Sequence, residues 1–325
     1  MQRFKNIMCV LTRRGNQSRV LARSVNLGES NQARLRVVMV AEKISVGMGI
    51  PEGGPISEEL QNALLRDSEE LLENVVRPFR DRVDIDTSVL VGTPFLEVIR
   101  EVLSSKHDLV VKTAEDPEWL DRVFDSDDMH LLRKCPCPVW LLKPRAPTRF
   151  RNILAAVDVD DDRHVQELEV QQALNYQVLQ LSASLAAAEQ ARLHVGHAWD
   201  AIDAGSLRGR LLSSFDMQID HYNETVRRHR QENLDRLLQH LTPDLRPESL
   251  EIQTQLVKGA PREVIPALAS AIEADLVVMG TVARTGIPGF IVGNTAEMIL
   301  SQVNCSVLAV KPPGFISPIA SQSLQ

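Results

Sequence analysis

A glycine-rich segment near the end of the chain carries the residue types that bind phosphate. An apolar run at 276–279 stops at Gly280, a loop with two further glycines follows, and Gly293-Asn294-Thr295 then begins a helical pattern. Glycine lets the backbone come close to a ligand. Amides at the start of a helix, together with the helix dipole, attract anions. The segment lacks both the GK[ST] of a Walker A loop and a GxGxxG fingerprint, so it indicates either a phosphate site of another pattern or a simple surface turn.

Strand and helix patterns alternate around this segment. Expected strands are 151–157, 192–198, 250–257, 276–279 and 305–310, and expected helices are 170–189, 207–241, 261–274 and 296–302. Strands joined by crossover helices predict an α/β fold, a mostly parallel sheet with helices on both faces. Ligands of such sheets lie outside the carboxyl ends of the strands, which is where Asp158 and Gly280 are expected.

The chain repeats itself, which indicates a duplicated domain. The stretch VGTPFLEVIREVLSSKHDLVVK at 91–112 returns as VKGAPREVIPALASAIEADLVVMG at 257–280. Likewise CPVWLLKP at 137–144 returns as CSVLAVKP at 305–312. Two copies of one domain in the same order are the simplest account, because a solenoid would have much shorter repeats.

Length and punctuation place the domain boundaries. The 325 residues suit two domains of about 150 residues each, and prolines near 144–147 mark a non-helical join. The predicted domains are 1–147 and 148–313, with a tail at 314–325.

Composition narrows the function classes. The net charge is −7, aromatic residues make up 4%, and no basic tract is present, which argues against a nucleic-acid surface. No apolar stretch is long enough to span a membrane. Four cysteines in the chain do not make a disulfide framework, so a cytoplasmic location is expected.

The repeat and the glycine pattern resemble the universal stress protein family in a tandem-domain form. That family carries a nucleotide-binding signature of Gly, two residues, Gly, nine residues, Gly and then Ser or Thr. Gly280 matches the first position and Gly293 the third, whereas Ala283 replaces the second glycine and Asn294 stands at the Ser/Thr position. The resemblance implies that each copy is an open five-stranded, mostly parallel, Rossmann-like sheet of the adenine nucleotide alpha hydrolase-like type. It also implies a stress-response ligand-binding or regulatory protein.

The resemblance further implies that the second copy binds ATP or a related nucleotide, with Mg²⁺ as a candidate companion. Asp158 would face the adenine or ribose, and Ala198 would lie at the second strand. The residues implied at the site are Val157, Asp158, Ala198, Met279, Gly280, Ala283, Arg284, Gly293, Asn294 and Thr295. Ala283 adds a methyl group where phosphates would pass, and Asn294 reaches differently from a hydroxyl group.

The first copy lacks the residues that would bind a nucleotide in the second copy. Lys112 stands at the first glycine, Thr12 stands at the position of Asp158, and the acidic segment 113–129 has no glycine. Its carboxylates would repel a triphosphate. We predict that this copy does not bind ATP.

Two other clusters invite a functional interpretation. Cys135 and Cys137, with His130 upstream, are weak candidates for metal ligands, because a zinc site needs about four. A buried structural role for Cys137 is favoured. The basic run 227–230 is interpreted as the solvated face of a helix, with Glu224 and Glu232 as partners.

No dedicated catalytic set stands out, so an enzyme activity stays open and would be at most slow ATP hydrolysis. An alternative is a first copy that acts as a scaffold or holds a more apolar ligand, such as a lipid intermediate. Apolar helix positions that could serve it are Leu60, Leu64, Leu71 and Val75. The apolar runs 139–142 and 307–310 are expected to pack the two copies as a pseudo-dimer. A homodimer of whole chains stays open.

Overall fold

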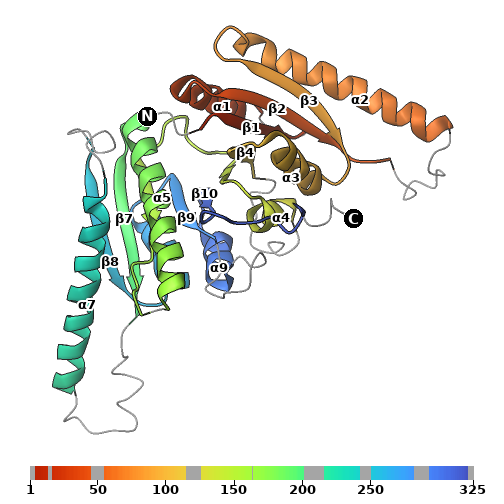
Figure 1. The fold of residues 1–325 in the computed structure, drawn as a ribbon. Coiled ribbons are helices and arrows are strands. Elements are labelled where there is room, and N and C mark those ends of the chain that lie inside the picture. The colour runs from red at the N-terminus through yellow and green to blue at the C-terminus, as the bar shows by residue number, and fades with distance from the viewer. Residues whose placement is uncertain are drawn as a thin grey trace. The chain divides into compact units, whose positions relative to one another are not determined.

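The computed structural model of the chain describes residues 4–13, 17–44, 55–114, 126–162, 164–200, 216–241, 250–281 and 293–320. These residues form two compact units. Unit 1 contains the described residues up to Thr148 and those from Ser306 onward, and unit 2 contains those from Arg149 to Cys305. Each unit is an α/β assembly (Figure 1), which confirms the predicted fold class.

Unit 1 is built on one mostly parallel sheet in the order β3-β2-β1-β4-β5-β10. Its elements are β1 (Asn6–Leu11), α1 (Gln17–Asn31), β2 (Arg34–Ala41), α2 (Pro55–Val76), a 3₁₀ turn (Arg77–Phe79), β3 (Ile85–Val91), α3 (Pro94–Ser105), β4 (Leu109–Thr113), α4 (Asp127–Lys134), β5 (Val139–Leu142) and β10 (Ser306–Val310). The strand order reverses between β1 and β4. Because such crossovers are right-handed, α1 and α2 cover one face, and α3 and α4 cover the other.

The last strand of the chain belongs to unit 1. Strand β10 lies antiparallel to β5, with Leu308 opposite Trp140, and the amide of Lys143 donates to Ser306 Oγ at 3.2 Å. Trp140 is fully buried in this part of the sheet. The two apolar runs singled out in the sequence therefore pair within one unit, while the association of the two copies as a pseudo-dimer stays a prediction.

Unit 2 holds a four-stranded parallel sheet in the order β9-β6-β7-β8. Its elements are β6 (Asn152–Ala156), α5 (Val165–Glu189), β7 (Arg192–Trp199), α7 (Asp216–Gln239), β8 (Ile252–Lys258), α8 (Pro261–Ala271), β9 (Leu276–Gly280) and α9 (Asn294–Gln302). Helices α5 and α7 lie side by side over this sheet in Figure 1, and α8 packs against α9.

An aspartate at the same position in each copy makes the same contact between the first and fourth strands. The carboxylate of Asp108 accepts the amides of Lys5 and Asn6 at the start of β1, the shorter contact being 2.6 Å. In unit 2, Asp275 accepts the amide of Arg151 in the same way, also at 2.6 Å. The aspartate before the fourth strand of each copy thus joins it to the first strand, which satisfies amides that the sheet leaves unpaired.

Helix boundaries differ modestly from the sequence prediction. Helix α5 begins at Val165 rather than at residue 170, and α8 ends at Ala271 rather than at residue 274. Residues 207–215 of the predicted long helix lie outside the described residues, and α7 runs from Asp216.

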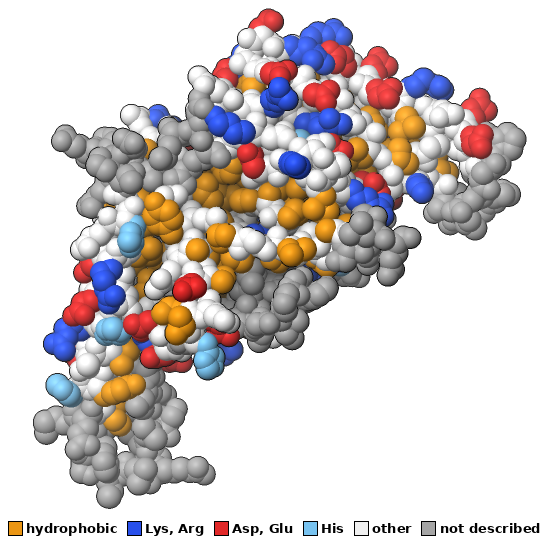
Figure 2. Space-filling model, viewed as in Figure 1, with side chains coloured by type: hydrophobic (Ala, Val, Ile, Leu, Met, Phe, Trp, Pro, Cys, Tyr) orange, Lys and Arg blue, Asp and Glu red, His pale blue; other side chains and the backbone are white. Residues whose placement is uncertain are grey.

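The outer face of unit 1 carries charges of both signs. Figure 2 shows Lys/Arg and Asp/Glu side chains interspersed over the region of α2. Some of them form exposed ion pairs, such as Arg80 with Glu73 and Arg82 with Glu29, each at 2.6 Å. Exposed pairs of this kind add little stability. No described helix is both long and apolar enough to cross a membrane.

Candidate functional site

The residues after β6 form a short acidic loop that α5 holds in place. The amide of Asp158 donates to Asn175 Oδ1 at 3.0 Å, and Asn175 Nδ2 donates back to the Asp158 carbonyl at 2.6 Å. Asn175 is 5% exposed, so both bonds are shielded from water. The Asp158 carboxylate in turn accepts the amide of Asp160 at 3.2 Å. A buried asparagine thus fixes where Asp158 stands at the end of its strand.

A buried histidine supports the same loop from the second strand. His197 is 3% exposed, and its Nδ1 lies 3.1 Å from the carbonyl of Val157 and 3.4 Å from the amide of Val159. Burial lowers the pKa of His197, against the opposing pull of nearby Asp158. Asn233 of α7 donates to the Val159 carbonyl at 3.0 Å. The loop is therefore tied to β7, α5 and α7 together.

Arg230 gathers the remaining carboxylates of the loop. It is 7% exposed and contacts Asp160 at 2.6 Å, Asp162 at 2.9 Å and also Asp161. His229 lies 2.7 Å from the second oxygen of Asp161. Guanidinium groups suit such multiple pairing because they present several donors in a fixed plane.

The solvated-face interpretation of the basic run 227–230 is therefore wrong for Arg230. It holds for Arg227, which pairs with Glu224 at 2.7 Å on the exposed side of α7. The sequence pattern failed because the partners of Arg230 lie in the β6–α5 loop, far from it along the chain.

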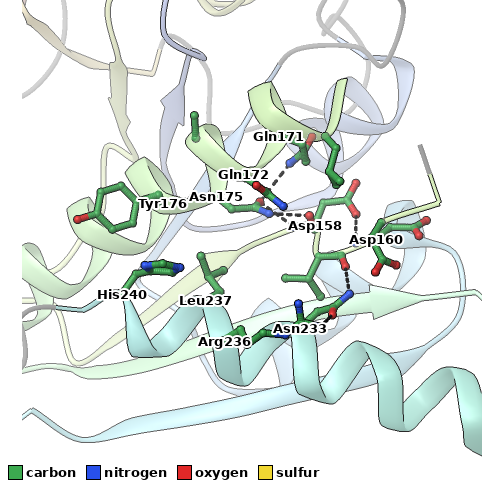
Figure 3. A pocket seen from close by; sticks show the side chains of 14 residues that line it. Asp158, Asp160, Gln171, Gln172, Asn175, Tyr176, Asn233, Arg236, Leu237 and His240 are labelled. Carbon is green, nitrogen blue, oxygen red and sulfur yellow. Dashed lines mark hydrogen bonds between the residues drawn. The ribbon is translucent and has the colours of Figure 1, made fainter. Parts of the chain in front are cut away.

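A cavity of about 570 Å³ opens beside this loop, between α5 and α7. Figure 3 shows Asp158, Gln171, Gln172 and Asn175 toward one end, and Tyr176 and His240 at the other. Its wall consists of Asp158, Val159, Asp160, Asp161, Leu168, Gln171, Gln172, Ala173, Asn175, Tyr176, Asn233, Arg236, Leu237 and His240. The rings of Tyr176 and His240 meet edge to face at 6.1 Å. Amides, carboxylates and rings on one wall can bind a small molecule that has both a polar edge and a flat ring.

The carboxyl edge of the sheet brings the predicted residues of β6 and β9 together. Ala156 pairs with Met279 in adjacent strands, so Asp158 and Gly280 leave the sheet at the same edge. Val157, Ala198 and Met279 are buried. Gly280 is not among the residues that line the cavity, and a Cβ atom there would stand 2.5 Å from Leu174 Cδ2 on α5. The glycine thus has a packing role that the sequence did not reveal.

The predicted phosphate end of the site lies at the start of α9. Gly293 is the N-cap of this helix, with φ −64° and ψ 139°, and as a glycine it has no side chain of its own to cap the first amides. The Gly293 amide donates to the Thr281 carbonyl at 3.2 Å. Asn294 and Thr295 in the first turn are exposed. Ala283 and Arg284 lie outside the described residues.

In unit 1, a buried ion pair stands at the position that corresponds to Gly280. Lys112, at the position of Gly280, is 2% exposed and donates to Asp128 of α4 at 2.6 Å. Ser126 caps α4 by accepting the amide of Met129. The start of α4 therefore carries a side-chain cap and a buried ion pair, where the second copy has Gly280 and a glycine at the N-cap of α9.

The weak metal candidates do not converge. Cys135 and Cys137 are adjacent, with 3.6 Å between their sulfur atoms, but the ring of His130 stacks on Phe95 at 4.3 Å. Among the described residues, no three side chains of the ligand types His, Cys, Asp and Glu gather as a metal site would require. Cys137 is 7% exposed, consistent with its predicted burial.

Sequence reasoning missed most of the cavity wall, including Asn175, Tyr176, Asn233 and His240. The one usable signal was Asn175, a polar residue on the apolar side of a predicted helix.

The chain holds a duplicated α/β fold, and its second copy has an acid after the first strand and a glycine at the end of the fourth. A sequence model of the universal stress protein family matches residues 3–143 and again residues 149–311. The chain belongs to the universal stress protein family, with two such domains in tandem.

The relatives narrow the identification further. Universal stress protein E of Escherichia coli (strain K12) is 35% identical over 228 residues, which are 70% of this chain and 67% of that protein. The Universal stress protein E homolog of Haemophilus influenzae is 28% identical over 318 residues, covering 95% and 98%. A crystal structure from Pseudomonas aeruginosa UCBPP-PA14 has a TM-score of 0.70 at 22% identity, covering 100% of this chain and 99% of that one. This last likeness shows the fold alone.

Proposed function

We propose that the protein is a stress-response binding protein whose unit 2 holds a nucleotide, ATP or a close relative, at the carboxyl edge of its sheet. The cavity beside Asp158 carries this proposal. Its 570 Å³ lies within the size range of small-molecule sites, at the strand ends where open α/β sheets bind ligands. Its amide-rich wall suits a base or a sugar, which offer both donors and acceptors.

The phosphates would lie at the amino end of α9. Amides at a helix start attract anions, and the exposed side chains of Asn294 and Thr295 add donors. Mg²⁺, when bound with the nucleotide, would neutralise phosphate charge through oxygen ligands. The Asp158 carboxylate beside the cavity is assigned to the adenine or ribose.

The proposed activity is binding, with slow ATP hydrolysis as the alternative. A general base needs a pKa near the working pH. Burial alone would raise the pKa of Asp161, but hydrogen bonds from Asn233, His229 and Arg230 lower it to about 2. Asp161 is therefore a poor base. Occupancy would act on partners in the cytoplasm only if the nucleotide binds two states of the protein unequally.

Isothermal titration calorimetry of the full chain with Mg-ATP tests the proposal. Asp158→Ala should weaken binding by about tenfold or more, because a loss of roughly 1.4 kcal/mol corresponds to one decade. Thr12→Ala, the same position in the first copy, is the matched control and should leave the titration unchanged. Equal affinities in the wild type and Asp158→Ala, or no heat of binding at all, would contradict the proposal.

A further inference from the structure

Two thiols and a lysine meet at the end of α4 in unit 1. Cys135 is the C-cap of this helix and is completely buried, and Cys137 is 7% exposed. Their sulfur atoms are 3.6 Å apart. Pro136 stands between them, and its ring restricts the backbone, so the separation of the two thiols is set by the chain itself.

Lys311 approaches the same helix end from β10. It is 5% exposed, and its Nζ donates to the carbonyl of Leu132 at 2.5 Å. The ammonium also lies 4.9 Å from the centre of the Phe315 ring. A cation at the carboxyl end of a helix is favourable, whereas a thiolate there would not be. The positive charge of Lys311 therefore offsets the partial negative charge of the helix end, which would otherwise disfavour a thiolate at Cys135.

The electrostatics of the three groups distinguish the two sulfurs. Burial would raise the pKa of Cys135, but hydrogen bonds from the Cys137 thiol and amide and the charge of Lys311 lower it overall. The hydrogen bond to Cys135 raises the pKa of Cys137, and burial adds to this. Burial lowers the pKa of Lys311 to about 7, and the charge of Cys135 opposes that shift. Cys135 is thus the thiol that ionises more readily, and Cys137 is the thiol that keeps its proton.

We propose that Cys135 and Cys137 form a reversible disulfide, a peroxide-sensitive modification site in which Lys311 positions and activates Cys135. The pair joins α4 to β5, and Lys311 directly follows β10. A change in the oxidation state of the thiols would therefore act on the pairing of β5 with β10.

The chemistry needs only a hydroperoxide as oxidant. The Cys135 thiolate attacks one peroxide oxygen, the O–O bond breaks, and water leaves after protonation, which gives a sulfenic acid. The Cys137 sulfur then attacks the Cys135 sulfur, the S–O bond breaks, and a second water leaves. Two thiols and one hydrogen peroxide thus give one disulfide and two waters. A thiol reductant reverses the step by exchange.

The test treats the full chain with hydrogen peroxide, blocks free thiols with an alkylating reagent under denaturing conditions, and digests with trypsin. Cleavage after Lys134 and Arg145 isolates a peptide that holds only these two cysteines, because Pro144 blocks cleavage after Lys143. We expect this peptide to lose two hydrogens and to escape alkylation until a reductant is added. Cys9 is the internal control, because it is buried alone and burial raises its pKa to about 12.

Two variants test the roles of the residues. In Cys137→Ser, a sulfenic acid should accumulate at Cys135 and react with a dione probe. Lys311→Met should slow disulfide formation several-fold, because a higher Cys135 pKa lowers the thiolate fraction more than it raises the nucleophilicity of the thiolate, and Lys311→Arg should restore part of the rate. Complete alkylation of both cysteines in peroxide-treated wild type would overturn the proposal. Oxidation of Cys9 at the same rate would overturn it too.

Discussion

At the scale of single residues, Arg230 explains why three adjacent aspartates can follow β6. Clustered carboxylates repel one another unless a cation lies among them. Arg230 contacts all three and is nearly buried, so it shapes the loop that carries Asp158.

We therefore expect Arg230→Met to destabilise unit 2. Because the three carboxylates are partly exposed, the loss should be about 1–3 kcal/mol, below that of a fully buried pair. Urea denaturation followed by circular dichroism measures it. Arg227→Met, on the exposed side of the same helix, is the matched control and should leave the midpoint where it is. Equal midpoints for the two variants would contradict the stabilising role of Arg230 in the acidic loop.

Asp161 should make unit 2 sensitive to acid. Its pKa of about 2 in the folded protein lies below the ordinary 3.8. A folded-state pKa that is lowered gives stabilisation that is complete above about pH 4 and lost as the pH falls toward 2. Asp161→Asn should lack this contribution, so the stability difference between wild type and variant should shrink in that interval. Denaturation curves at several acidic pH values provide the check, with Asp235→Asn as the control. A constant difference would show that the assigned pKa is wrong.

At the scale of elements, the end of β9 is shaped by helix packing. Gly280 leaves room for Leu174 of α5, whose neighbours Ala173 and Asn175 line the cavity. The same glycine was expected from sequence to serve the phosphate loop, and the packing contact is a second reason for it.

Gly280→Ala should destabilise unit 2 by about 1–3 kcal/mol through overpacking. Leu174→Ala added to it should recover part of that loss, whereas independent sites would simply add. A double-mutant cycle from thermal or urea unfolding measures the coupling. Additive losses would mean that the backbone relaxes and the contact does not matter.

The buried pair of Lys112 and Asp128 fixes α4 against β4 in unit 1. Removing one partner should be costly: Lys112→Met leaves Asp128 buried without its 2.6 Å donor and should cost about 3 kcal/mol or more. The double variant Lys112→Met with Asp128→Leu should be much less destabilised, because no charge is left buried. If the double variant loses as much as the sum of both single variants, the pair is not the stabilising feature.

How much of this was predictable differs from element to element. The β9–α9–β10 segment was clear from sequence, because buried parallel strands give continuous apolar runs such as 276–279 and glycine interrupts them. The start of α5 was missed because Val165 and Val170 are exposed, at 72% and 49%, and break the apolar periodicity. The cavity was missed for another reason, since its walls come from α5 and α7, whose facing residues are far apart in sequence.

At the scale of the whole molecule, duplication has left two copies that differ at the end of the fourth strand and at the helix that follows it. The first copy has the buried pair of Lys112 and Asp128 at the end of its fourth strand, and the second has a glycine N-cap on α9 and a cavity beside Asp158. The asymmetry is the basis for assigning the ligand to unit 2 alone.

Native mass spectrometry of the full chain with Mg-ATP tests this central claim most directly, because it counts bound molecules. We expect a single nucleotide per chain, retained in Thr12→Ala and lost in Asp158→Ala. Two bound nucleotides, none, or a single one that survives Asp158→Ala would contradict it.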